Sequence, residues 1–123
     1  KIWEMSYEEL SQINTASHWG PFFKDTRIPT LEEVLDYCKD KIKLNIEVKV
    51  NDHQTQDFIA RLVGLIQAKG MAEQCMITSF DYHSLQAVKQ LDPALETGFI
   101  SSKAIEQPES FTSADNFVLS ILC

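Results

Sequence analysis

The sequence predicts an α/β fold, a parallel (β/α) barrel of the TIM type, of which this chain holds about half, as four βα units. Two observations lead to this prediction. Segments with a helical apolar stripe alternate with short apolar segments typical of strands, and the crossovers are long enough for parallel pairing. The strand predicted over residues 42–50 also has a polar face, which a barrel interior accommodates near its active-site end, whereas inner strands of an open doubly wound sheet are apolar on both faces.

Length, composition and charge allow one domain, or part of one, and argue against polyanionic partners. The 123 residues, of which 44% are hydrophobic, can bury one core and are too few for two ordinary domains. Proteins that bind nucleic acid or anionic membranes present clustered Lys and Arg, whereas this chain has a formal net charge of −7. We therefore expect no nucleic-acid partner and only local contacts to phosphate.

The cysteines and the first residues do not indicate the cellular compartment of the protein. Cys38, Cys75 and Cys123 have neither a CxxC spacing nor a nearby histidine, so we expect buried free thiols rather than a zinc site. No apolar run reaches the length of a membrane span. Lys1 is not a methionine and no signal-peptide core follows it, so we expect an internal piece of a gene product whose signal or membrane anchor could lie upstream.

Two capping boxes mark the first two predicted helices. Ser6 can accept a hydrogen bond from a free helix N–H while Glu9 reaches back to the cap, and Thr30 with Glu33 repeats this arrangement. Between them, residues 17–27 are aromatic and polar without a period, which is typical of a structured loop. The apolar stripe of the second helix has helical spacing; it consists of Leu31, Val34, Leu35 and Cys38.

The remaining elements alternate strand and helix. Residues 42–50 alternate apolar and polar side chains with a period of two, and the helix after them has the stripe Phe58, Ile59, Leu62, Leu65 and Ile66 and ends at Lys69-Gly70. A short apolar strand follows over residues 75–80, and Asp81 can cap a helix that runs to Leu91 before Pro93. We further expect a strand over 97–100, a short helix over 102–106 and a last strand over 117–122.

Glu47 and Lys49 are the candidate catalytic side chains. They lie two residues apart on one face of a strand, beside Asn45, so the Cβ atoms of Glu47 and Lys49 are roughly 6.5 to 7 Å apart. A carboxylate there can ligate a hard divalent cation, and an ammonium group can offset charge on a phosphate oxygen. An exposed amphipathic strand would explain the same alternation, but helices on both sides of it in sequence favour a barrel interior.

Other polar residues offer weaker candidates. Possible general acids or bases are His18, His53 and His83. The first two lie in predicted loops and the third in a first helical turn, which are ordinary places for surface histidines. Of the three, only His53, just past the strand predicted over residues 42–50, could approach Glu47 and Lys49. Ser79 and Asp81 flank Phe80 at a strand end, where barrels place functional groups, although Asp81 can be a helix cap and Ser79 can satisfy local backbone groups. No GxSxG, P-loop, GxGxxG or HExxH motif is present.

The sequence resembles the glycerophosphodiester phosphodiesterases, metal-dependent (β/α)₈-barrel enzymes related in fold to phosphatidylinositol-specific phospholipase C. Four segments match in order and together cover most of the chain. Ser-Tyr-Glu-Glu-Leu at 6–10 is similar to the T-Y-E-E-L of the family, and Arg-Ile-Pro-Thr-Leu-Glu-Glu-Val-Leu at 27–35 follows. Leu-Asn-Ile-Glu-Val-Lys at 44–49 and Ile-Thr-Ser-Phe-Asp at 77–81 complete the match.

The resemblance implies a role for each matching residue. Glu47 corresponds to a metal-ligating carboxylate, and Lys49 to an active-site lysine that contacts the phosphodiester; both are therefore expected to be catalytic. Ser79 and Phe80 correspond to residues that line the substrate site. The implied substrate is a glycerophosphodiester, cleaved to glycerol 3-phosphate and an alcohol with Ca²⁺ or Mg²⁺ as cofactor.

The chain departs from the family pattern by what it does not contain. The His-Arg-Gly strand, the Glu-x-Asp metal pair and the His-Asp motif of the family, including the histidines that act as general acid and base, would lie before Lys1, and the last Trp-containing strand after Cys123. We therefore expect residues 1–123 to form a partial domain, its central and C-terminal βα units, inactive by itself. A non-catalytic barrel-derived module that self-associates through open sheet edges is the alternative.

Overall fold

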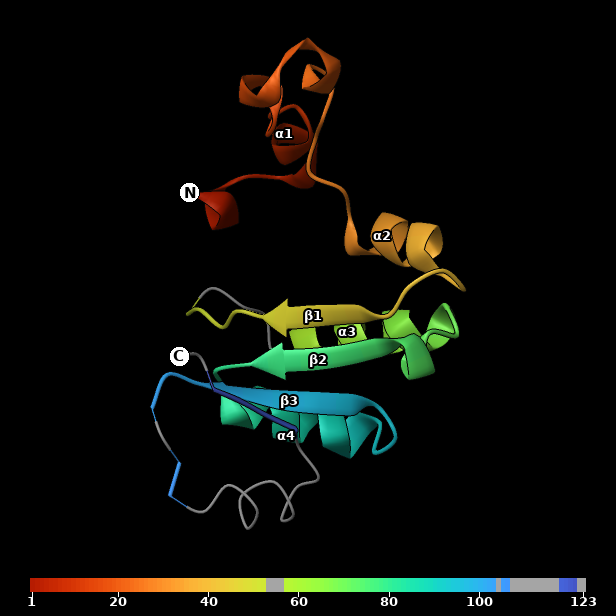
Figure 1. Ribbon diagram of the computed structural model, residues 1–123, viewed down its shortest axis with the longest axis vertical. Helices are drawn as coiled ribbons and strands as arrows, with labels where there is room; N and C mark the ends of the chain where they lie inside the picture. Colours follow the sequence, from red (N-terminus) through yellow and green to blue (C-terminus); the bar gives the residue numbers. More distant parts are fainter. Residues whose placement is uncertain (53–56, 104, 107–117, 122–123) are drawn as a thin grey trace. The chain divides into compact units, whose positions relative to one another are not determined.

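The computed structural model describes residues 1–52, 57–103, 105–106 and 118–121 (Figure 1). The chain divides into two compact units, Lys1–Val34 and Leu35–Cys123. Helix α2 (Leu31–Cys38) contains the boundary between them. The first unit consists of short helical turns, and the second contains the sheet.

The first unit is held by capping side chains. It contains η1 (Ile2–Glu4), α1 (Tyr7–Ser11), η2 (Ser17–Trp19) and η3 (Pro21–Phe23). The predicted capping box of α1 is confirmed, since the Ser6 hydroxyl accepts from the Glu9 N–H at 3.2 Å and the Ser6 N–H donates to the Glu9 carboxylate at 2.7 Å. The predicted structured loop is confirmed as well. The Asn14 amide closes it by accepting from two backbone N–H groups and donating to the carbonyls of Phe23 and Lys24.

Helix α2 begins at the second predicted capping box. The Thr30 N–H donates to the Glu33 carboxylate at 2.8 Å, and the Thr30 hydroxyl accepts from the Glu33 N–H at 3.1 Å. These contacts from the Thr30 backbone and hydroxyl to Glu33 hold the pKa of that carboxyl below its ordinary value. Leu35, on the predicted apolar stripe, is fully buried. The local sequence signals for this helix are therefore confirmed.

The second unit is a parallel α/β arrangement, as predicted. Its strands are β1 (Leu44–Val48), β2 (Cys75–Ser79), β3 (Glu96–Ser101) and β4 (Val118–Ile121), paired in parallel in the order β1-β2-β3-β4. Helix α3 (Phe58–Ala68) and the turn η4 (Ala72–Gln74) connect β1 to β2, and α4 (Tyr82–Leu91) connects β2 to β3. Gly70 ends α3 with a φ of +65°, a left-handed conformation in which glycine is favoured.

Helices α3 and α4 lie on one face of the sheet (Figure 1). The core between these layers is built from apolar side chains that alternate with polar ones along the strands. Its buried residues in the second unit are Leu35, Val48, Leu62, Val63, Ile66, Met71, Cys75, Ile77, Leu85, Val88 and Leu95. The other face of β1 presents the polar row of Asn45 and Glu47, so the strand has the one-sided pattern that the sequence predicts.

Strand β1 is shorter than predicted. Ile42 and Val50 are 60% and 49% exposed, and β1 pairs with β2 from Leu44 to Val48. The partner strand ends at Ser79, where the chain turns into α4, so there is no ladder to extend β1 toward Val50. The length of a strand is thus set here by its neighbour.

The predicted helix over residues 102–106 is wrong for the described residues in that range. The Ser101 hydroxyl donates to the carbonyl of Lys103 at 2.8 Å and accepts from the N–H of the same residue at 3.1 Å. These contacts close a local loop after β3, and serine side chains that bind nearby backbone groups in this way offer an alternative to helix formation. The predicted last strand is confirmed over Val118–Ile121, while Phe117 and Leu122 lie outside the described residues.

The cysteine prediction is confirmed for Cys75, which is a free thiol and 3% exposed. Burial, with the Cys38 thiol nearby, raises the pKa of Cys75. Cys38 is a half-buried free thiol, and Cys123 lies outside the described residues. Across the described ranges, no helix has both the length and the apolar character needed to span a membrane.

Leu85 on α4 tests the packing of this core. We expect Leu85→Ala to lower the free energy of unfolding by about 2–5 kcal/mol, because the fully buried side chain would leave a cavity. Leu91→Ala on the same helix is the control; Leu91 is 49% exposed, and its removal should cost well under 1 kcal/mol. Urea unfolding of both variants, followed by circular dichroism, checks this, and equal losses would contradict the assignment of the core.

Asp81 tests the cap of α4. Its carboxylate accepts from the Ser84 N–H at 2.7 Å, and this bond lowers the pKa of Asp81. We expect Asp81→Ala to cost about 1 kcal/mol near pH 7. A lowered folded pKa contributes stability above the unfolded pKa, and this contribution is lost as the pH falls through the folded value, so the difference should shrink below about pH 4.

Asp81→Asn is the matched control, because asparagine caps helices well but does not titrate. This variant should retain most of the free energy of unfolding near pH 7. It should lack the decrease in stability that titration of the Asp81 carboxyl causes at acidic pH. The measurement is urea unfolding as a function of pH. An alanine variant that stays equally destabilised down to pH 2 would contradict the prediction.

Candidate functional site

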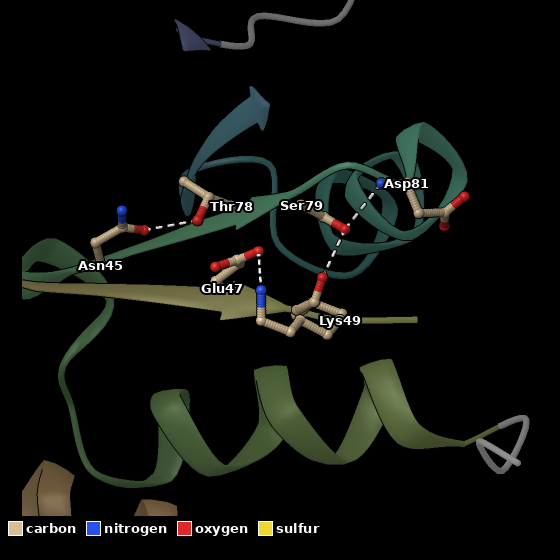
Figure 2. Close-up of polar contacts among 7 residues, drawn as sticks. Asn45, Glu47, Lys49, Thr78, Ser79 and Asp81 are labelled. Atoms are coloured by element: carbon tan, nitrogen blue, oxygen red, sulfur yellow. Dashed lines mark hydrogen bonds and ion pairs between the residues drawn. The ribbon is translucent and has the colours of Figure 1, made fainter. Parts of the chain in front are cut away.

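The candidate site lies on the face of β1 opposite the helices, toward the carboxyl end of the strand (Figure 2). The pairing register sets Glu47 beside Thr78 of β2 and Asn45 beside Met76. Lys49 follows the last residue of β1. Side chains of residues two apart on a strand share a face, so Asn45, Glu47 and Lys49 form a single polar row.

Glu47 and Lys49 form an ion pair. The Lys49 Nζ lies 2.6 Å from the Glu47 Oε1, and the two side chains are 77% and 33% exposed, respectively. A pair this open to water adds little stability, because solvent screens the attraction. Within the described residues, no other side chain donates a hydrogen bond to Glu47. Its second carboxylate oxygen is therefore available to a ligand.

Asn45 and Thr78 form a polar contact next to this pair. The Thr78 hydroxyl donates to the Asn45 Oδ1 at 2.8 Å, and Thr78 is 3% exposed (Figure 2). This contact orients the Asn45 amide on the same face as Glu47. The sequence alone did not identify Thr78, because its place beside Glu47 depends on the pairing of two strands that a long helix separates. The alternation of side chains along residues 75–80 is the signal that could have indicated which face of the strand Thr78 occupies.

Ser79 is the last residue of β2. It pairs with Val48, so it shares the helix-covered face of the sheet, and it is 1% exposed. Its hydroxyl donates to the Val48 carbonyl at 2.8 Å and accepts from the Asp81 N–H at 2.9 Å. These bonds engage the hydroxyl within the protein.

Phe80 borders an open hollow beside the ion pair. The hollow has a volume of about 330 Å³. Its lining comes from the ends of β1 and β2 and comprises Glu47, Val48, Lys49, Val50, Ser79, Phe80 and Asp81. Phe80 is 49% exposed and offers an apolar surface next to the charged pair. The structure thus brings Glu47, Lys49 and Phe80 together at the carboxyl ends of parallel strands, where barrels place their functional groups.

Among the described histidines of the second unit, His83 is not one of the residues that line this hollow. His83 is exposed in the first turn of α4, and His18 is exposed in η2 of the other unit. His53, the one expected to approach the site, lies outside the described residues. In residues 1–52, 57–103, 105–106 and 118–121, no group of three His, Cys, Asp or Glu side chains could hold a metal ion.

The oxygen chemistry of the site nevertheless suits one ligand of a hard cation. Glu47 offers a carboxylate oxygen that is not hydrogen-bonded by the described residues, and carboxylates are preferred ligands of Ca²⁺ and Mg²⁺. A full coordination sphere takes six or more oxygens. Glu47 therefore fits as one member of a larger ligand set.

Known proteins match this chain over most of its length. The model of the glycerophosphoryl diester phosphodiesterase family matches residues 1–120. YhdW of Bacillus subtilis strain 168 is 33% identical over 121 residues, which cover 94% of this chain and 49% of that protein. The glycerophosphodiester phosphodiesterase of Caldanaerobacter subterraneus subsp. tengcongensis is 29% identical over 106 residues, which cover 85% of this chain and 44% of that protein. The chain thus spans about half the length of the curated relatives it matches.

A solved structure has the same fold. The Oleispira antarctica phosphodiesterase in complex with the product sn-glycerol-3-phosphate superposes with a TM-score of 0.85 at 24% identity, over 98% of this chain and 50% of that one. This similarity confirms the predicted fold class, a barrel of the TIM type present in part. The match of the family model over residues 1–120 leads to one assignment. The chain belongs to the glycerophosphoryl diester phosphodiesterase family.

Proposed function

We propose that this chain carries part of the active site of a divalent-cation-dependent glycerophosphodiester phosphodiesterase. The reaction consumes one water and yields glycerol 3-phosphate and an alcohol. The observation that carries the proposal is the Glu47–Lys49 ion pair, at 2.6 Å, on the polar face of a parallel sheet in a chain of this family. A carboxylate for a cation and an ammonium for a phosphate anion are the groups that such a reaction needs.

Three residues of the hollow have separate roles in this proposal. Glu47 supplies one oxygen to a Ca²⁺ or Mg²⁺ ion, and such an ion, when bound, would polarise a phosphoryl oxygen. Lys49 leaves its pairing with Glu47 to contact a non-bridging oxygen of the phosphodiester. Phe80, half-exposed beside both, provides an apolar wall for the carbon skeleton of the substrate. The net charge of −7 is consistent with a small substrate rather than a polyanion.

The proposal requires groups that the described residues do not supply. One carboxylate cannot complete a sphere of six or more oxygens, and the leaving alkoxide needs a general acid in addition to the lysine that contacts the phosphodiester. We propose that the remaining βα units of the family barrel supply them. A protein in which this chain is joined to those units is a complete barrel. The chain alone would then be inactive.

A second candidate is a non-catalytic module that associates with another copy. Within the described residues, β1 and β4 each pair on one side only, so each leaves a row of backbone N–H and C=O groups at a sheet edge. Such edges favour pairing with a further strand. A molar mass measured by light scattering separates the candidates, since a monomer at micromolar concentration would contradict self-association.

Glu47→Gln in the complete barrel tests the metal role. We expect kcat/KM to fall by at least about 100-fold, because metal polarisation is worth several kcal/mol and about 1.4 kcal/mol corresponds to a factor of ten. The fold should be unchanged, since Glu47 is outside the core. Glu73→Gln is the matched control, an exposed carboxylate in η4 at the start of β2 that should keep full activity. Full activity of Glu47→Gln would remove Glu47 from the site.

The 123-residue chain by itself tests the need for further units. Incubated with glycerophosphocholine and millimolar Ca²⁺ or Mg²⁺, it should release no choline above background, because it lacks most metal ligands and a general acid. The complete barrel, assayed in parallel, is the positive control. Turnover by the short chain near that of the complete barrel would overturn this part of the proposal.

A further inference from the structure

We propose that Ser79 is a positioning residue for Lys49 and that its hydroxyl does not contact the substrate. Its hydroxyl holds the peptide bond that leads into Lys49 and connects that bond to the beginning of α4. The inference rests on the proposed function, which assigns Lys49 to the phosphodiester.

The first observation is the bond from Ser79 to β1. The Ser79 hydroxyl donates to the Val48 carbonyl at 2.8 Å, and this carbonyl belongs to the peptide bond between Val48 and Lys49 (Figure 2). The pairing of β1 with β2 ends at the Val48–Ser79 pair. The hydroxyl thus adds a cross-strand bond where the backbone ladder stops, and this bond limits rotation of the peptide plane before Lys49.

The second observation is the bond from Ser79 to the helix. Its hydroxyl accepts from the Asp81 N–H at 2.9 Å, and the Asp81 carboxylate accepts from the Ser84 N–H at 2.7 Å. Three consecutive hydrogen bonds therefore run from the first turn of α4 through Asp81 and Ser79 to Val48. The end of β1 is connected in this way to a capped helix, which is a rigid support.

Burial makes these bonds effective. Ser79 is 1% exposed, so water cannot readily replace either partner. Removing the hydroxyl would leave the Val48 carbonyl and the Asp81 N–H without this partner in a buried place, which is costly. Ser79 also shares the helix-covered face with Val48, opposite Glu47. A direct contact between its hydroxyl and a substrate beside Glu47 is therefore disfavoured.

Lys49 benefits from such support because of where it lies. It follows the end of β1, and its side chain is 77% exposed. A long side chain in this position is directed by the peptide plane that carries it. A displacement of about 1 Å in a catalytic group can cost about 100-fold in rate. Holding the Val48–Lys49 peptide thus helps to place the ammonium beside Glu47 and the phosphodiester.

A double-mutant cycle in the complete barrel tests this inference. Ser79→Ala, Lys49→Met and the double variant are compared with the parent by kcat/KM on glycerophosphocholine. We expect Ser79→Ala to lower kcat/KM about tenfold in the parent and less than about twofold in the Lys49→Met background, since coupled residues are not additive. Ser79→Thr, which keeps the hydroxyl, should restore most of the activity.

Controls separate positioning from stability. Ser84→Ala makes the same substitution in the first turn of α4 but keeps the Ser84 N–H that binds Asp81, so its activity should match the parent. Urea unfolding of every variant reports stability; the loss caused by Ser79→Ala should be the same with Lys49 or Met at residue 49. If Ser79→Ala does not fold, Ser79→Cys, whose thiol is a weak donor, takes its place in the cycle.

The outcomes distinguish this inference from the proposed function. Equal losses from Ser79→Ala in both backgrounds, or no loss in the parent, would overturn the positioning role while Lys49 keeps its own. Full activity of Lys49→Met would instead show that Lys49 takes no part in the reaction. That result would overturn both the proposed role of Lys49 and the positioning role of Ser79. Loss of activity in Lys49→Met with no further loss on adding Ser79→Ala would support both.

Discussion

The parallel pairing of β1 with β2 is the constraint on which the second unit depends. Its register sets Glu47 beside Thr78 and Val48 beside Ser79. Because side chains alternate across a strand, a slip of one residue would exchange the faces of all of them. The burial of Val48 and Ile77 under the helices therefore also decides which side chains face the hollow. Core packing and the geometry of the candidate site follow from the same pairing.

Opposite faces of the same strands carry the core and the candidate site. On the helix-covered side, Ile77 of β2 and Leu85 and Val88 of α4 are fully buried, whereas the other face of β1 presents Asn45 and Glu47. Ser79 lies in the covered layer and bonds to the backbone next to Lys49. The chain spans about half the length of its curated relatives.

Local signals predicted most of the elements. The boxes at Ser6 and Thr30 and the cap at Asp81 involve residues three apart, so their hydrogen bonds form within one turn and can be recognised from the sequence. In the described part of residues 102–106 the expected helix is not formed, and the Ser101 hydroxyl binds the backbone of Lys103 there. Such competition between two local arrangements is decided by small energy differences that composition does not reveal.

The sequence by itself determined the alternation of helices and strands and the polar row of Asn45, Glu47 and Lys49, because both follow from spacing along the chain. Only the tertiary structure decided which residues of the neighbouring strand contact that row and the backbone beside it. The contact of Thr78 with Asn45 joins residues 33 apart, and that of Ser79 with Val48 joins residues 31 apart. Contacts at such separations depend on the register between strands, which packing under α3 and α4 selects. For that reason, motif and spacing could mark Ser79 as part of the site, while its burial and hydrogen bonds were needed to identify what it holds.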